Sequence, residues 1–220
     1  MQLVQVPIFP LPNIVFFPKI LLPLHIFEPR YRKMVTDALH GEHHIGMVLL
    51  QEGWENDYYG TPPIFSVGCL GKMEAHERIE QGRYNILLRG INRFEIVDFV
   101  RQQPYRIARV RLLTDEPLKM DPKQQNLERD RFLSRFEQYL AEVMGIEVEK
   151  DMIERTGTLE AAINQVAATL DIPVIDKQSL LQVAKVGERF DRLRRIIEER
   201  LRVAYYLRHL NIIPNDPSLN

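Results

Sequence analysis

Short hydrophobic runs separated by turn-forming residues make up the first half of the chain. The runs of strand length are 4–6, 20–22, 45–50, 64–70, 84–88, 94–99 and 105–113. Glycine, proline and polar residues lie between them, as in 60–63, and are typical of turns. Ala108 and Val110 alternate with Arg109 and Arg111, the period of a strand with one face in water. We therefore expect a compact, mostly antiparallel β-barrel rather than alternating strand–helix units.

One stretch in this half has helical spacing. Tyr31, Met34, Val35 and Ala38 fall on one face of a helix over 29–39. Proline at position 29 suits a first helical turn, because its missing N–H would have no partner there. The pattern predicts one short helix packed on the barrel.

After residue 117 the hydrophobic period becomes helical. The three apolar stripes are Phe132, Phe136, Leu140 and Val143; Leu159, Ala162, Ile163, Val166 and Leu170; and Phe190, Leu193, Ile197, Leu201 and Ala204. Thr158 is expected to cap the second stripe, which Pro173 ends, and Asp176 is expected to cap a short helix through Leu181. Amphipathic helices joined by short loops predict a small bundle.

The change of period sets the expected domain organisation of this α+β chain. We predict a β-barrel subdomain over 1–117, a helical-bundle subdomain over 118–210 and a flexible polar tail over 211–220.

Composition narrows the function classes. The 220 residues are 45% hydrophobic and 27% charged, which is ordinary for a globular protein with a packed core. Lysine and arginine total 29 against 30 acidic residues, and the first 117 residues are also balanced, which disfavours nucleic acid as a partner. No apolar stretch reaches the ~18–20 residues of a membrane span, and no signal peptide is visible. We expect a cytoplasmic protein.

Most reactive side chains favour structural roles. The single cysteine, Cys69, lies in an apolar run and is expected to be a buried thiol rather than a nucleophile. His40, His43 and His44 with Glu42 resemble metal ligands, but the adjacent histidines would point apart, so we expect a solvated turn. No metal site, cofactor site or catalytic residue is predicted.

Charged pairs also receive mainly structural interpretations. Glu28 and Arg30 are expected to form a salt bridge or cap at the helix start, because no nucleophile accompanies them. His25 lies among apolar residues and is expected in a hydrogen-bonded core position. Glu198 and Arg202 have the spacing of an ion pair along the last helix.

Arg83, Arg89 and Arg93 are interpreted as solvated faces of strands and turns, with a local anion-binding patch as the alternative. Tyr205 and Tyr206, near the end of the last helix, are candidates for packing on a second copy. The sequence leaves monomer and homodimer open.

Three aromatic residues in the polar connection 51–63 are the candidate peptide-contact residues: Trp54, Tyr58 and Tyr59. Aromatic side chains on surface loops are favoured anchors for partners, because they bring a large contact area with few rotatable bonds. The alternative is that these rings fold back and pack locally over the barrel edge.

Several motifs occur in an order that matches a known family. They are 6–18 (VPIFPLPNIVFFP), 22–31 (LPLHIFEPRY), 67–72 (VGCLGK), 82–90 (GRYNILLRG), 171–173 (DIP), 177–181 (KQSLL) and 188–190 (ERF). The series resembles the N-terminal, substrate-binding domain of Lon proteases (ATP-dependent protease La). The resemblance implies a PUA-like β-barrel followed by a helical bundle. It also implies a region that captures unfolded polypeptides for an ATP-driven motor.

The catalytic motifs of that family are not visible in this chain. There is no G-x-x-x-x-G-K-[ST] loop to hold nucleotide phosphates, and no serine has the glycine-rich setting of a nucleophile in a Ser–Lys dyad. We expect a non-catalytic recognition module that binds unfolded or extended polypeptide segments, as an adaptor or quality-control factor. The alternative is an RNA-binding module, on the analogy of other PUA-like folds.

Overall fold

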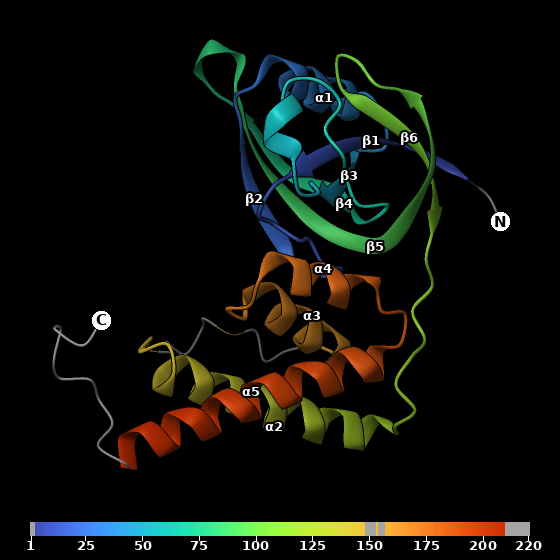
Figure 1. Ribbon diagram of the computed structural model, residues 1–220. Coiled ribbons are helices and arrows are strands. Elements are labelled where there is room, and N and C mark those ends of the chain that lie inside the picture. Colours follow the sequence, from blue (N-terminus) through green and yellow to red (C-terminus); the bar gives the residue numbers. More distant parts are fainter. Residues whose placement is uncertain (1–2, 148–152, 154–156, 210–220) are drawn as a thin grey trace, which may run out of the picture. The chain divides into compact units, whose positions relative to one another are not determined.

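The computed structural model describes residues 3–147, 153 and 157–209 (Figure 1). The chain divides into two compact units, Met1–Glu116 with Ala167–Lys185, and Pro117–Val166 with Val186–Asn220. The first unit therefore includes a segment from late in the sequence. The predicted tail, 211–220, lies outside the described residues. The subdomain boundaries at 117 and 210 stay predictions.

The first unit contains a six-stranded sheet with the order β2-β5-β4-β3-β1-β6 (Figure 1). The strands are β1 (Val4–Leu11), β2 (Leu21–Ile26), β3 (His44–Leu49), β4 (Val67–Arg78), β5 (Tyr84–Arg101) and β6 (Arg106–Leu112). Strands β1 and β3 pair in parallel, and the other pairs are antiparallel. Because β6 pairs with both β1 and β5, the strands β5, β4, β3, β1 and β6 form a closed ring of pairings, and β2 pairs with β5 alone. Together with the helices, this sheet confirms the α+β class.

Strand β5 is continuous where the sequence predicted two strands, 84–88 and 94–99. Gly90, which lies between the two predicted runs, is a ladder residue at a point of close approach. A Cβ atom there would lie 2.1 Å from the carbonyl oxygen of Phe17. The backbone of Gly90 also accepts a 2.8 Å hydrogen bond from Lys19 N and donates a 2.9 Å bond to Ile20 O. Glycine therefore lets the preceding segment pack on β5 without ending the strand.

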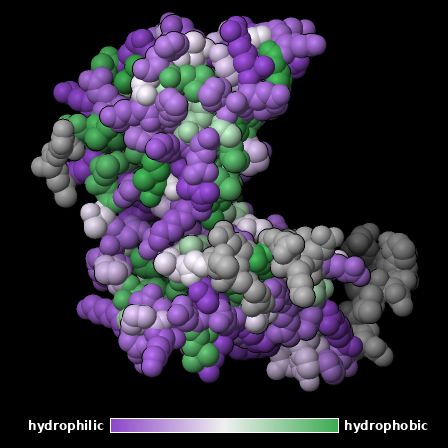
Figure 2. All heavy atoms as spheres, turned by 180° about the vertical axis from the view of Figure 1, so that it is seen from behind, coloured by the Kyte–Doolittle hydropathy of each residue, from purple (hydrophilic) through white to green (hydrophobic). Residues whose placement is uncertain are grey.

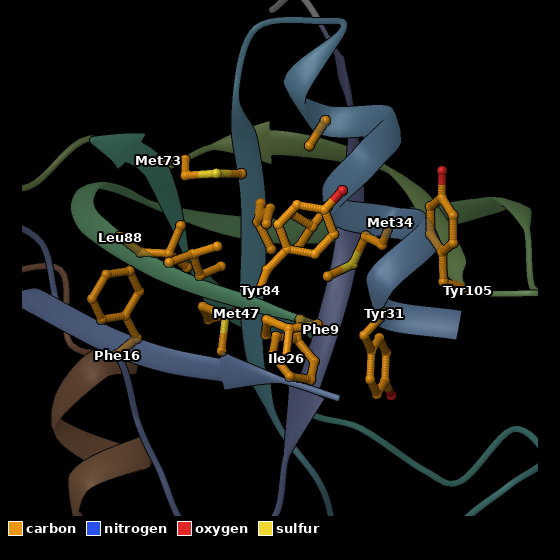
Figure 3. Close-up of a cluster of buried hydrophobic side chains, with 14 of the residues drawn as sticks. Phe9, Phe16, Ile26, Tyr31, Met34, Met47, Met73, Tyr84, Leu88 and Tyr105 are labelled. Atoms are coloured by element: carbon orange, nitrogen blue, oxygen red, sulfur yellow. The ribbon is translucent and has the colours of Figure 1, made fainter. Parts of the chain in front are cut away.

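The helix α1 (Pro29–Leu39) has the predicted bounds, and its predicted face is buried. This face packs into the main hydrophobic core, where side chains from α1 and the strands point toward one another (Figure 3). Cys69 lies in the same core, and burial raises the pKa of its thiol well above the usual range. The expectation of a buried thiol is confirmed. A second cluster forms around Phe94 and Val110.

The helix α4 (Val174–Gln182) belongs to the first unit, where it contacts β4 and β5. The amide Nε2 of Gln178 donates to the carbonyl of Val67 at 2.9 Å. Arg93, only 2% exposed, forms a 2.5 Å salt bridge with Asp115 and donates to the carbonyl of Leu181 at 3.0 Å. The prediction of a solvated Arg93 is wrong, because an acidic partner and the free carbonyls at a helix end compensate its burial.

The sequence predicted a capping residue at the start of two helices, α4 and α3. The helix α4 begins before Asp176, with Pro173 at the N-cap, so the predicted cap is wrong. The helix α3 (Leu159–Thr169) is capped as predicted, with Thr158 Oγ1 accepting from Ala161 N at 3.2 Å.

His25 is exposed rather than in the core, because the side chains of β2 alternate between two faces and Ile26 is the one turned inward. Its ring Nδ1 lies 2.8 Å from Oδ1 of Asn85 on β5.

The second unit is organised around α2 (Pro122–Glu142) and α5 (Val186–His209). Phe132 and Phe190 meet edge to face with ring centroids 5.0 Å apart. Glu198 pairs with Arg135 of α2 rather than with the predicted Arg202, since Arg135 Nε reaches its carboxylate at 2.8 Å.

None of the described helices combines the length and apolar character that crossing a membrane needs. Hydrophilic residues cover most of the face seen in Figure 2, with hydrophobic residues in smaller groups.

Candidate functional site

A pocket of about 200 Å³ opens in the first unit. Five segments line it: β1, the first turn of α1, Leu50 just after β3, the connection 58–62 and the turn 102–106. Two of the three predicted contact residues, Tyr58 and Tyr59, are in its wall, together with Arg30. The structure thus places Arg30, predicted in a helix-start salt bridge, in the same pocket wall as the predicted contact residues Tyr58 and Tyr59.

Arg30 holds the wall of this pocket together. Its Nε donates to Oε2 of Glu28 at 2.9 Å, and both Nη atoms lie 3.3 Å from the carbonyl oxygen of Tyr58. The guanidinium carbon is 4.6 Å from the ring centroid of Tyr31 and 5.2 Å from that of Tyr58, within the range of cation–π attraction. One side chain therefore connects the helix start to the aromatic connection.

The expected salt bridge or cap at the helix start is formed as a salt bridge between Glu28 and Arg30, without a side-chain cap. The residue at the N-cap is Glu28, and its side chain makes no capping hydrogen bond. Its backbone carbonyl instead accepts from the amides of Tyr31 and Arg32 at 3.0 and 2.9 Å. The carboxylate is engaged elsewhere, because Oε1 accepts a 2.7 Å hydrogen bond from the hydroxyl of Tyr58.

The three predicted aromatic residues lie together but differ in exposure. Tyr58 is half-buried, and burial and the hydrogen bond to Glu28 raise its pKa above the usual value. Trp54 packs edge to face on Tyr58 with centroids 5.5 Å apart, and Tyr59 does so at 5.0 Å. Tyr59 is 85% exposed. Tyr58 and Trp54 thus have local packing partners, while Tyr59 presents its ring to solvent. Peptide contact by these residues stays a prediction.

Arg106, the first residue of β6, also lines the pocket. It is 7% exposed, and its Nη2 donates to the carbonyl of Pro62 at 2.6 Å. Burial lowers the pKa of its guanidinium below the usual value. This arginine was not among the predicted site residues. The signal was present, because the period of two places Arg106 on the same face as the buried Ala108 and Val110.

Two buried tyrosines complete the surroundings of the pocket. Burial raises the pKa of Tyr31 to about 12, so its hydroxyl keeps its proton at neutral pH. Tyr105 donates from its hydroxyl to Oδ2 of Asp37 at 2.7 Å, and this bond lowers the pKa of the Asp37 carboxyl. Figure 3 shows both rings on the side of the core beside α1. These hydroxyls are neutral groups rather than acids or bases.

The histidines predicted to form a solvated turn lie outside this pocket. His40 Nδ1 is 2.7 Å from the carbonyl oxygen of Thr36, and His44 Nδ1 is 3.2 Å from a carboxylate oxygen of Glu42. No group of three or more His, Cys, Asp or Glu in the described ranges could hold a metal ion.

The lining of the pocket combines aromatic faces with polar groups. It offers tyrosine faces, prolines, a buried guanidinium and the polar groups of the turn 102–106. Among its described lining residues there is no serine, cysteine, lysine or histidine to act as nucleophile or base.

Curated proteins similar to this chain are Lon proteases. The chain is 27% identical over 207 residues to Lon protease 1 of Bdellovibrio bacteriovorus, covering 90% of this chain and 25% of that protein. It is 26% identical over 200 residues to Lon protease 2 of Myxococcus xanthus, covering 83% of this chain and 22% of that protein. The chain thus spans about a quarter of the length of the curated relatives that it matches.

Solved structures share the fold. The crystal structure of a Lon N-terminal domain protein from Xanthomonas campestris has a TM-score of 0.59 at 22% identity, covering 86% of this chain and 96% of that one. The N-terminal domain of a Mycobacterium avium complex Lon protease has a TM-score of 0.60 at 17% identity, covering 90% and 98%. The family model of the ATP-dependent protease La (LON) substrate-binding domain matches residues 5–199. This chain therefore belongs to the LON substrate-binding domain family.

Proposed function

We propose that this chain is a non-catalytic recognition module that binds extended or unfolded polypeptide segments. Its family is defined by a substrate-binding domain, and its relatives are proteases that act on polypeptides. The observation that carries the proposal is the exposed Tyr59, held by the anchored Tyr58 at the edge of a pocket of about 200 Å³. An exposed aromatic ring beside a pocket is a common anchor for a peptide side chain.

The anchoring of the aromatic connection supports binding energetically. Tyr58 is held by Glu28 through its hydroxyl and by Arg30 through its carbonyl. Ordering a loop on binding costs about 0.5–1.5 kcal/mol per immobilised side chain. A connection that is already fixed avoids part of this cost, so the rings of Trp54, Tyr58 and Tyr59 form a preorganised contact surface.

The finer architecture and the cellular role are part of the same proposal. We propose that the ring of paired strands is a PUA-like β-barrel spanning 1–117 and that the helices of 118–210 form a bundle, as the resemblance implies. The chain would act in the cytoplasm as an adaptor or quality-control factor, as monomer or homodimer. Limited proteolysis with mass spectrometry would test these boundaries.

Binding is tested by titrating the chain with a reduced and carboxymethylated protein, which stays unfolded in native buffer. Intrinsic fluorescence of Trp54, which is the single tryptophan, reports on the aromatic connection itself. Tyr59→Ala is expected to weaken binding about tenfold, the effect of removing an interface anchor. The matched control is Tyr206→Ala, another exposed tyrosine, on α5, which should leave the affinity unchanged. Equal affinities for all three proteins would exclude this site.

A further inference from the structure

We propose that the pocket binds a carboxylate group of the polypeptide, and that Arg106 is its ligand. This inference rests on the proposed polypeptide binding and specifies its chemistry. The carboxylate comes from the C-terminus of the bound chain or from an aspartate or glutamate side chain.

Arg106 differs in its partners from Arg93, the other buried arginine of the first unit, and from Arg30, the other arginine of the pocket. Arg93 has Asp115, and Arg30 has Glu28. Arg106, although 7% exposed, has no carboxylate within salt-bridge distance among the described residues, and its only hydrogen bond goes to the carbonyl of Pro62. A buried guanidinium without a counter-ion is costly, so an anion that enters the pocket recovers a large part of that cost.

Arg106 keeps N–H donors that no described residue satisfies. Only Nη2 has a hydrogen-bond partner within the described part of the chain. The other guanidinium nitrogens are not among the fully enclosed polar atoms, and the residue lines the cavity. Nη2 has a second N–H beside the N–H groups of Nε and Nη1, and an adjacent pair of guanidinium N–H groups matches the two oxygens of a carboxylate.

The charges around the pocket favour a peptide carboxylate over a nucleic-acid phosphate. The charge of Arg30 is already compensated by Glu28, which leaves one guanidinium to bind one negative charge. Asp57 is close enough to interact electrostatically with Arg106, and its negative charge disfavours a dianion more than a monoanion. Nucleic acids are held through several basic residues, whereas the chain carries a net charge of −1. Pro62 and the tyrosines supply walls suited to a peptide.

The test uses decapeptide pools that carry an uncharged BODIPY label, which has no carboxylate, and that are made in four versions. The C-terminus is either free or amidated, and aspartate and glutamate are either allowed or omitted. Fluorescence anisotropy should show that pools with the required carboxylate bind at least about tenfold more tightly than the amidated, acid-free pool, because a charge-assisted hydrogen bond contributes this much. The arm that retains this preference identifies the source of the carboxylate.

The variant Arg106→Gln should abolish the preference for carboxylate and leave binding of the amidated, acid-free pool unchanged. The matched control is Arg109→Gln, an exposed arginine on the same strand, which should keep the preference. Because Arg106→Gln could unfold, competition is also measured on the unmodified chain. Sodium acetate should displace the acidic peptides more strongly than sodium chloride at equal ionic strength.

The outcomes separate the two proposals. Equal binding of all four pools, or a preference that survives Arg106→Gln, overturns the carboxylate site and leaves polypeptide binding intact. Absence of binding to any pool and to the unfolded protein overturns the proposed function and the carboxylate site together. A single-stranded RNA that displaces peptide through Arg106 overturns the carboxylate site in favour of a phosphate ligand.

Discussion

The hydroxyl of Tyr58 donates a 2.7 Å hydrogen bond to Oε1 of Glu28, which lies 30 residues earlier in the chain. This bond joins the connection between β3 and β4 to the N-terminus of α1. The carboxylate that receives it is mostly buried and also pairs with Arg30. The Tyr58 hydroxyl therefore decides how firmly the aromatic connection is held beside the pocket.

Tyr58→Phe removes this hydroxyl and keeps the ring. We expect the free energy of unfolding to fall by about 1 kcal/mol, the usual net contribution of a hydrogen bond. Hydrogen exchange of the amides in 54–60 should accelerate, and chemical denaturation gives the stability. Tyr59→Phe is the control, because its ring is 85% exposed. A loss of similar size in both variants would show that the bond to Glu28 does not hold the connection.

Arg93→Ala is expected to destabilise the chain by about 3–5 kcal/mol, because it removes one partner of a buried ion pair. The substitution leaves Asp115 without this partner and the carbonyl of Leu181 without its donor. Urea denaturation measures the loss. Arg89 lies on the same strand, β5, as Arg93. Arg89→Ala removes an exposed pair with Glu74 and should cost no more than about 1 kcal/mol. Similar losses for both would contradict a compensated burial of Arg93.

Gly90→Ala should lower stability by about 1–3 kcal/mol through overpacking. The new methyl group would meet the carbonyl oxygen of Phe17 at 2.1 Å, and backbone cannot move aside as a flexible side chain can. Gly41→Ala is the control, since its nearest contact would be an ordinary 3.7 Å. Thermal unfolding compares the two variants. An unchanged melting temperature for Gly90→Ala would mean that the segment before β2 is free to shift.

Tyr105→Phe is expected to raise the pKa of Asp37 toward its ordinary value of 3.8, because the hydroxyl is the main cause of the lowering. A lowered carboxyl pKa stabilises the fold above the unfolded-state pKa, and this stability is lost as the pH falls through the folded-state value. The variant should therefore be less stable than the unmodified chain at pH 7, and the difference should shrink in acid.

Carboxyl carbon chemical shifts followed by NMR give the pKa of Asp37 directly, and urea denaturation at neutral and acidic pH gives the two stabilities. A stability difference that does not change with pH would assign the effect of Tyr105→Phe to packing alone.

Local features of the fold could be predicted from the sequence. The helix α1 was predicted to the residue because a proline and a regular apolar period define it within a short stretch. Pairing was not predictable, because β5 contacts β2, β4 and β6 over long separations. Arg93 was misassigned for the same reason, since its acceptors lie at Asp115 and in α4.

The candidate site could be predicted only in parts. The pair of Glu28 and Arg30, and the aromatic residues, each carried a local signal. That these residues lie together in one site depends on contacts such as that of Arg30 with the carbonyl of Tyr58, 28 residues away. No local sequence pattern predicts such a contact. Arg106 could have been placed on the buried face by strand alternation. Its missing counter-ion, in contrast, is a property of the folded surroundings.

The return of α4 to the first unit determines when that unit can be completed during synthesis. All its strands have left the ribosome by the time residue 116 emerges, but 167–185 follow only after α2 has been made. Until then the carbonyl of Val67 lacks Gln178, and Arg93 lacks the carbonyls at the end of α4. A nascent chain paused between α2 and α4 would expose this part of the sheet to chaperones. The strand region therefore cannot mature strictly in the order of translation.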